Sequence, residues 1–158
     1  MATHFNGSPD QVRALDAYVK LMRAADSVSL AVSRSLAQSG LTESQFGVLE
    51  ALFHLGPMRP CELATKLLTS GANMTTVIDN LEKRALISRE KLLEDRRSFT
   101  IHLTAQGRQI IAELFPRHAA FVTAEISALD AAEQEALGTL CRKLGKAVRR
   151  LREEKIPT

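Results

Sequence analysis

The stretch "LEDRRSFTIHLT", Leu93 to Thr104, places an acid and two arginines directly before an alternation of apolar and polar residues. Alternate residues of a β-strand point to opposite faces, so this alternation predicts a strand with one apolar face. The apolar set is Phe99, Ile101 and Leu103, and the polar set is Ser98, Thr100 and His102. Residues 86–91 predict a second strand, which residues 92–97 would join to the first as the tip of a β-hairpin. Two arginines at such a tip require an explanation.

The segment before the hairpin has the pattern of an amphipathic helix that ends near Arg84. Thr69, Ser70 and Gly71 form a cluster that is typical of a turn followed by a helix N-cap. Four apolar residues then recur at helical spacing and would pack inward: Met74, Val77, Ile78 and Leu81. Polar residues at i, i+3, i+7 and i+10 share the outer face: Asn73, Thr76, Asn80 and Lys83. The sequence therefore predicts an exposed polar helix face beside the hairpin.

Two shorter helices are predicted before this one. Thr42 and Gln45 have the spacing of a capping box at the start of the first, and Leu41 and Phe46 fit a hydrophobic staple across it. The second begins at Pro60, because a proline loses nothing at the first position of a helix, where its N–H would have no partner. Three short helices followed by a two-stranded hairpin is the order of a winged helix-turn-helix. The expected fold is therefore mainly α with a small β-hairpin wing.

Longer helices are predicted on both sides of this unit. One covers residues 10–38, and a second starts at Thr104, where the internal Pro116 predicts a kink that costs about 3 kcal/mol. Asp130 with Glu133 has capping-box spacing and predicts the start of a last helix. That helix carries an apolar stripe beside the basic run Arg142 to Lys155; the stripe is Leu137, Leu140, Leu144, Val148 and Leu151.

The predicted order of elements fits DNA binding. A helix can lie in the major groove, which is about 12 Å wide, and its first N–H groups, here near Ser70 and Gly71, can bind a phosphate. A hairpin beside it can reach the minor groove, whose negative potential favours a guanidinium group. We therefore expect Arg96 and Arg97 to contact DNA, with Asp95 orienting one of them through a charge-assisted hydrogen bond.

Plainer interpretations stay open for these residues. Arg96 and Arg97 could form a solvated turn that only prevents edge pairing. Lys83 and Arg84 suit either phosphate contacts or the favourable placement of positive charge at a helix C-terminus. An ordinary polar helix face would explain the remaining set, which is Asn73, Thr75, Thr76 and Asn80. The order of elements favours DNA contact for the arginines and for the polar face as a group.

Five pieces of the sequence, in order and with preserved spacing, resemble the MarR family of bacterial transcriptional regulators. They are "LTESQFGVLEAL", "CELATKL", "TTVIDNLEKRALISR", "EDRRSFTIHLTAQG" and the helix that follows. The similarity extends from about Val12 to Arg152, and the DRR step followed by LTxxG is its most specific part.

The resemblance implies a homodimer in which residues 10–38 and 104–153 form a helical dimerisation region and residues 41–103 form the DNA-binding domain. Gly71 to Arg84 would be the recognition helix, and Arg96 or Arg97 the wing arginine. Members typically repress genes at a pseudo-palindromic operator and release DNA when a small, often aromatic or phenolic, effector binds between the two regions. Candidate residues for lining an effector pocket are Tyr18, Met22, Phe115 and His118.

Three positions depart from the usual pattern of the family. Ala85 stands where a glycine is usual, so either the alanine adopts a left-handed conformation at a cost of roughly 1–2 kcal/mol, or the turn differs. The wing tip carries Leu92 and Leu93 in place of more polar residues. The helix predicted to begin at Pro60 follows Arg59 rather than a serine or threonine cap, which removes one hydroxyl that could contact a phosphate.

The composition of the chain limits its domain organisation and the other classes of protein to which it could belong. With 158 residues, 45% of them hydrophobic, the chain suits one domain or a small domain with additional dimerising helices. Its net charge of +3 is only weak evidence for a polyanionic partner. Cys61 and Cys141 make neither a disulfide framework nor a metal cluster, and thiol sensing is the less favoured interpretation. The sequence has neither the pattern of a signal peptide nor an apolar run of membrane-spanning length, so a cytoplasmic protein is expected.

No phosphate-binding glycine loop, nucleophile elbow or acid/base pair of carboxylates is evident, so we expect neither an enzyme nor a cofactor. The histidines lack metal-ligand spacing, so no metal is expected. The favoured interpretation is a ligand-responsive regulator that binds double-stranded DNA as a homodimer. Its alternative is a helical small-molecule-binding or protein-adaptor dimer that has lost DNA binding, with the wing leucines marking a protein contact.

Overall fold

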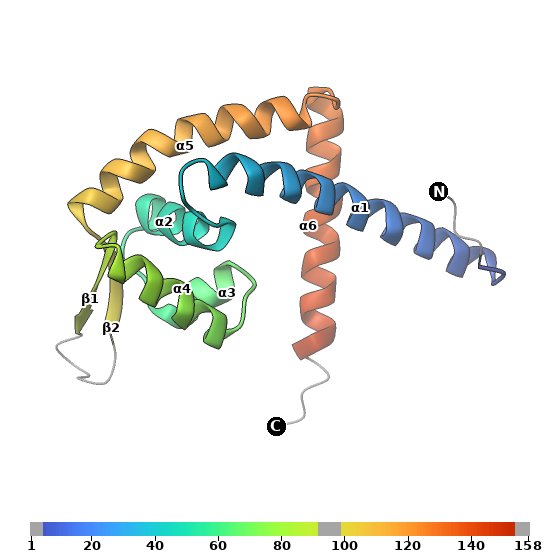
Figure 1. Cartoon of the computed structure of the whole chain (residues 1–158). Coiled ribbons are helices and arrows are strands. Elements are labelled where there is room, and N and C mark those ends of the chain that lie inside the picture. Colours follow the sequence, from blue (N-terminus) through green and yellow to red (C-terminus); the bar gives the residue numbers. More distant parts are fainter. Residues whose placement is uncertain (1–4, 92–98, 154–158) are drawn as a thin grey trace. The chain divides into compact units, whose positions relative to one another are not determined.

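The computed structural model describes residues 5–91 and 99–153, and it is mainly helical (Figure 1). The helices are α1 (Pro9–Ala37), α2 (Glu43–Leu55), α3 (Pro60–Lys66), α4 (Gly71–Lys83), α5 (Ala105–Ile126) and α6 (Ala131–Glu153). Strands β1 (Ile87–Lys91) and β2 (Phe99–Leu103) pair antiparallel, with Ile87 opposite Leu103 and Lys91 opposite Phe99. Three short helices therefore precede a β-hairpin, and the predicted fold class is confirmed.

Two of the predicted helix starts have the predicted capping contacts. At the start of α2, the Thr42 hydroxyl accepts from the backbone N–H of Gln45 at 3.2 Å, and the Gln45 side chain accepts from the N–H of Thr42 at 3.1 Å. Asp130 and Glu133 make the same reciprocal pair at the start of α6, with both distances 2.9 Å. Each pair satisfies two N–H groups that a helix start leaves without intrahelical partners.

The core of the winged unit is formed by the apolar faces of its helices together with the hairpin. Leu49 of α2, Leu63 of α3, Leu81 of α4 and Ile101 of β2 are fully buried. Ile101 also forms an isolated antiparallel bridge with Met58, in which each residue donates its N–H to the carbonyl oxygen of the other. The strand alternation is confirmed, because the side chains of Thr100 and His102, two residues apart, lie 2.8 Å from one another while the intervening Ile101 points into the core.

The LTxxG step fastens the start of α5 to the base of the hairpin. The Thr104 hydroxyl donates to the carbonyl oxygen of Ala85 at 2.7 Å and accepts from the N–H of Gly107 at 3.0 Å. The N–H of Thr104 donates to the carbonyl oxygen of Leu86 at 3.2 Å. A Cβ at Gly107 would collide with that Leu86 carbonyl group. Glycine is therefore required at this position by the close approach of two backbone segments.

Ala85 adopts the first of its two predicted alternatives, because its φ is +55°. The N–H of Ala85 bonds to the carbonyl oxygen of Glu82 at 2.8 Å, and the N–H of Leu86 bonds to that of Leu81 at 3.0 Å. This is the pattern of a left-handed helix cap, with alanine in the place that glycine usually occupies. The turn therefore keeps its usual geometry and the alanine bears the strain.

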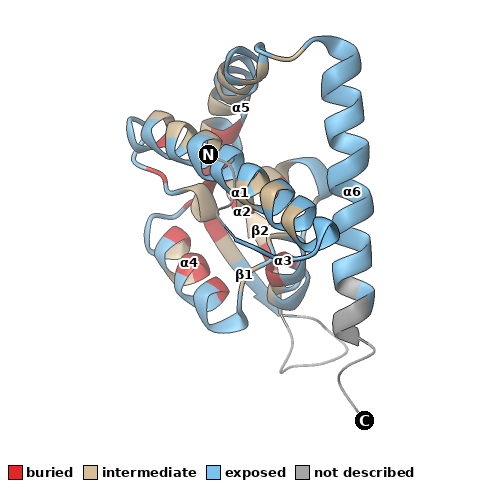
Figure 2. Cartoon of the chain, turned by 90° about the vertical axis from the view of Figure 1, so that its right-hand side faces the viewer, coloured by how far each residue is buried: buried red, intermediate tan, exposed pale blue. Residues whose placement is uncertain are grey.

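Helix α5 is continuous from Ala105 to Ile126, so Pro116 lies inside the helix and does not end it. The chain divides into two compact units, Met1–Phe121 and Val122–Thr158. In the second unit, every α6 residue whose burial is described is exposed, as Figure 2 shows. The exposed residues include four members of the predicted apolar stripe: Leu137, Leu140, Leu144 and Val148. Within the described residues, no helix is both long and apolar enough to cross a membrane.

Candidate nucleic-acid interface

The start of α4 is organised by three polar side chains. The Ser70 hydroxyl accepts from the backbone N–H of Asn73 at 3.2 Å, which makes Ser70 the N-cap of the helix. The Asn73 side-chain amide donates to the Thr69 hydroxyl at 2.7 Å. Gly71 is the first helical residue, and it is exposed together with Asn73. The structure therefore brings the three predicted contacts Ser70, Gly71 and Asn73 together at one helix end, where N–H groups and helix dipole favour an anion.

The two predicted faces of α4 have the predicted burial. Met74, Val77, Ile78 and Leu81 are buried, whereas the predicted contact residues beyond the helix start are exposed: Thr75, Thr76, Asn80 and Lys83. The Thr75 hydroxyl donates to the carbonyl oxygen of Gly71 at 3.0 Å, and the Thr76 hydroxyl donates to that of Ala72 at 3.3 Å. Their hydroxyl oxygens can still accept hydrogen bonds, and each threonine also carries a methyl group.

Arg84 has a partner within the protein that sequence reasoning did not find. Its guanidinium group donates to the carbonyl oxygen of Gly40 at 2.8 Å. Gly40 has a φ of +67° and lies in the turn between α1 and α2. Arg84 therefore fastens that turn to the C-terminal end of α4. Its predicted contact with phosphate stays a prediction, as does that of the neighbouring Lys83.

The hairpin next to α4 is confirmed, but the residues of its tip lie outside the described part of the chain. Asp95, Arg96 and Arg97 belong to this segment, and so do Leu92 and Leu93. The register pairs Lys91 with Phe99, so the segment 92–98 joins the two strand ends. Contact of the wing arginines with DNA stays a prediction from the sequence.

Arg89 of β1 is a residue of this region that sequence reasoning missed. Its Nη1 lies 2.7 Å from a carboxylate oxygen of Glu82, and its Nη2 bonds to the carboxylate of Asp79. Its guanidinium carbon also lies 5.4 Å from the centre of the Phe99 ring. One side chain therefore joins β1 to two acids of α4 and to an aromatic ring of β2. No short-range pattern marks it, because these partners come from separate segments of the chain.

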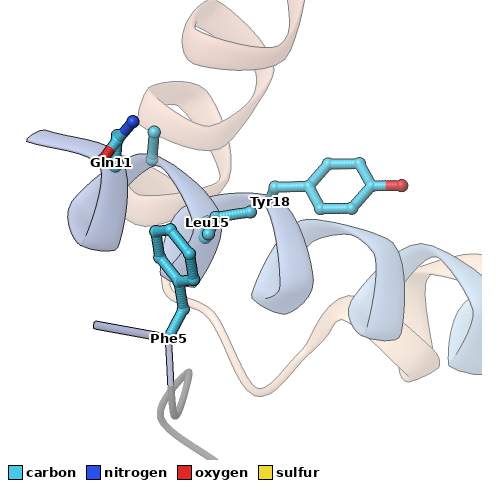
Figure 3. A pocket seen from close by; sticks show the side chains of 5 residues that line it. Phe5, Gln11, Leu15 and Tyr18 are labelled. Carbon is cyan, nitrogen blue, oxygen red and sulfur yellow. The ribbon is translucent and has the colours of Figure 1, made fainter. Parts of the chain in front are cut away.

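The four candidate residues for an effector pocket do not line one described hollow. Tyr18 lines a hollow of about 450 Å³ at the start of α1 together with Phe5, Gln11, Ala14 and Leu15 (Figure 3). Met22, Phe115 and His118 are not among its lining residues.

Phe115 and His118 instead pack on α2. The His118 ring lies 4.4 Å from that of Phe46, and the Phe115 ring lies 4.6 Å from that of His54, measured between ring centres. The Nδ1 atom of His118 is buried and has no hydrogen-bond partner among the described residues.

Neither a metal site nor a disulfide is evident in the described part of the chain. No group of three or more histidine, cysteine, aspartate or glutamate residues in residues 5–91 and 99–153 could hold a metal ion. Cys61 and Cys141 are free and exposed. The exposed start of α4 and its outer face carry polar and charged side chains that can form hydrogen bonds and ionic contacts. Three short helices followed by an antiparallel hairpin, with one helix that exposes a polar face, are the architecture of the winged helix-turn-helix class of DNA-binding proteins.

Comparison with known proteins agrees with this class. Residues 41–99 match the model of the MarR family. The chain is 35% identical to the HTH-type transcriptional regulator YkoM of Bacillus subtilis, over 84% of this chain and 86% of that protein. It is 32% identical to the transcriptional repressor MprA of Escherichia coli, over 71% of this chain and 65% of that protein. The chain belongs to the MarR family.

A solved structure supports the same assignment. The structure of BpsR from Bordetella bronchiseptica, whose DNA binding is regulated by 6-hydroxynicotinic acid, has a TM-score of 0.75 and 27% identity to this chain. The match covers 82% of this chain and 98% of BpsR. The resemblance inferred from the sequence is thus confirmed, and the protein is a DNA-binding transcriptional regulator. The family consists of transcriptional regulators rather than enzymes.

Proposed function

We propose that this protein is a ligand-responsive repressor that binds a pseudo-palindromic operator as a homodimer in the cytoplasm. The observation that carries the proposal is the exposed start of α4, where Ser70, Gly71 and Asn73 lie together beside the helix face that ends at Lys83. Such a helix enters the major groove, where its first residues contact the edges of the bases. Cationic side chains provide most of the affinity through their contacts with the phosphate groups of the DNA backbone. Repression is the activity named for the relative MprA.

Two further features of the proposal rest on different observations. The exposed apolar stripe of α6 suits burial against a second copy, because contiguous apolar surface of this kind is rare on monomers. Residues 10–38 and 104–153 would provide the dimer contacts and residues 41–103 the DNA contacts. A small aromatic effector is proposed because such a molecule regulates DNA binding in BpsR. Tyr18, Met22, Phe115 and His118 remain its candidate contacts.

Selection of bound fragments from a random duplex library at about 150 mM salt tests the proposed function. We expect an inverted repeat whose half-sites lie about one helical turn apart, because two symmetry-related recognition helices would address it. Binding that is weak, independent of sequence and lost as salt rises would contradict a sequence-specific repressor. In that case the charge of the protein would act only as a generic attraction for polyanions.

Replacing Asn73 tests base recognition within that operator. We expect Asn73→Ala to relax the base preference at one position of each half-site, at about 1–3 kcal/mol of discrimination. The measurement is the affinity for a set of operators with single base-pair changes. A uniform loss of affinity for every sequence would contradict base recognition by this side chain. Lys83→Ala is the matched control, because a phosphate contact is expected to weaken binding to all sequences alike.

A further inference from the structure

Helix α4 of this DNA-binding protein carries two carboxylates, Asp79 and Glu82. Between Gly71 and Lys83 the charged side chains are Asp79, Glu82 and Lys83, two carboxylates and one ammonium, so the helix sums to −1. Arg84, the C-cap residue, adds a positive charge that brings residues 71–84 to zero, and its guanidinium group donates to the Gly40 carbonyl oxygen. Carboxylates close to a phosphate backbone oppose binding, since like charges brought together cost free energy. The two carboxylates of α4 therefore require a counter-charge directly beside them.

Arg89 provides that counter-charge. Its two terminal nitrogens contact one acid each, Glu82 at 2.7 Å and Asp79 through Nη2. A guanidinium group can do this because its N–H donors point in fixed directions within one plane. The contact with the Phe99 ring, at 5.4 Å, holds the same group from the other strand of the hairpin. The three charged side chains thus form one cluster with a net charge of −1 instead of the −2 of the two acids alone.

The cluster lies where its charge matters for DNA. Asp79 is four residues after Thr75, and Glu82 is three residues further on, so the acids continue a stripe that begins at an exposed, predicted DNA contact. The side chains of Asp79 and Glu82 are 45% and 37% exposed, and that of Arg89 is 32% exposed. At this exposure, their charges act on the solvent and on any polyanion bound beside α4.

We propose that Arg89 neutralises Asp79 and Glu82 for DNA, acting as a positioning residue that sets affinity through the charge of the recognition helix. The proposal rests on the proposed function and concerns an interaction that is independent of base sequence. It differs from a purely structural role, in which Arg89 would only hold the hairpin against α4. The two roles can be separated. A structural role needs the ion pairs between Arg89 and the acids, whereas the electrostatic role needs only that the negative charge of Asp79 and Glu82 be removed or compensated.

The test uses four versions of the full chain, of which the native protein is the first, together with one control variant. Affinity is measured on the selected operator and on a random-sequence duplex. Arg89→Met removes the charge and keeps an apolar chain beside Phe99; we expect it to weaken both affinities about tenfold at low salt. The deficit should shrink as salt is raised, because screening weakens an electrostatic effect. Adding Asp79→Asn and Glu82→Gln to Arg89→Met should restore affinity to within about threefold of the native protein. A triple variant as weak as Arg89→Met would overturn the proposal.

The fourth version keeps Arg89 and removes the charge of both acids through Asp79→Asn with Glu82→Gln. We expect it to bind about threefold more tightly than the native protein, and unchanged or weaker binding would contradict the proposal. This version decides the question if Arg89→Met fails to fold, as judged by circular dichroism.

Lys20→Met is the matched control, since Lys20 pairs with Asp16 at 2.6 Å on α1. If Lys20→Met loses as much affinity for DNA as Arg89→Met does, the effect comes from net charge alone, which would contradict the proposal.

The random duplex keeps this test separate from that of the proposed function. If no operator is selected, the repressor hypothesis fails, but the Arg89 series can still be read on the random duplex. If an operator is selected and Arg89→Met binds it as the native protein does, only the inference about Arg89 fails.

Discussion

At the residue scale, Ala85 bears a backbone strain that a single substitution should relieve. Its φ is +55°, a conformation in which the Cβ of an L-residue crowds the backbone. We expect Ala85→Gly to raise the free energy of unfolding by about 1 kcal/mol, measured by urea denaturation. Ala112→Gly, at an exposed position of α5, is the control and should lower it by about 0.5–1 kcal/mol. A decrease with Ala85→Gly would mean that the left-handed turn is not strained.

Gly107 presents the opposite case, in which a side chain cannot be accommodated. A Cβ there would collide with the Leu86 carbonyl group, so the start of α5 would have to move away from the base of the hairpin. We expect Gly107→Ala to lower the free energy of unfolding by about 1–3 kcal/mol. Gly138→Ala should cause no loss, because nothing lies within 4 Å of its added methyl group and alanine favours the helix. Equal stabilities for the two variants would contradict the close approach.

At the scale of elements, the wing is held by its base. Thr104, directly after β2, bonds the carbonyl oxygen of Ala85, and Arg89 of β1 bonds two acids of α4. The described hairpin is therefore attached both to α4 and to the cap that follows it. The pairing of Lys91 with Phe99 fixes the ends of the two described strands relative to each other. The described base of the wing is thus held in place before any DNA binds, so ordering it costs no entropy on binding.

The wing arginines provide the prediction at this scale. We expect Arg96→Ala with Arg97→Ala to weaken operator binding at least about tenfold, or about 1.4 kcal/mol, without unfolding the protein. The measurement is the equilibrium affinity for the selected operator, with circular dichroism as the check on folding. Arg13→Ala with Lys20→Ala removes the same charge from α1 and should leave affinity nearly unchanged. Operator binding at native strength by the folded wing variant would exclude the wing from the interface.

At the scale of the whole molecule, the described chain leaves the apolar stripe of α6 uncovered. Leu137, Leu140, Leu144 and Val148 are 44%, 63%, 49% and 42% exposed. They recur at helical spacing, so they share one face, and burying apolar surface of this kind contributes roughly 25 cal/mol per Å². A second copy with the same face would satisfy the twofold symmetry that a pseudo-palindromic operator requires.

Charge placed on this face should prevent dimerisation. We expect Leu140→Lys with Leu144→Lys to give a monomer by sedimentation equilibrium and to weaken binding to the two-half-site operator by at least about tenfold, since the half-sites would be bound separately. Gln134→Lys with Thr139→Lys adds the same charge to other exposed positions of α6 and should leave a dimer. If the leucine variant stays dimeric, the dimer contacts must lie elsewhere.

The amino-acid sequence by itself determined the order of the elements, the helix starts at Thr42 and Asp130, the faces of α4 and the alternation along β2. These features depend on residues within one or two turns of each other, where periodicity and capping act over short distances. The polar side of the candidate interface could be predicted for the same reason, from Ser70 to Lys83.

Only the tertiary structure decided which distant groups meet. Arg84 bonds the carbonyl oxygen of Gly40, which is 44 positions away in the chain, and Arg89 bridges Asp79, Glu82 and Phe99. The rings of His118 and Phe115 pack on those of Phe46 and His54 of α2. Such contacts follow from the relative placement of whole elements, which depends on packing throughout the core and leaves no periodic pattern in the sequence.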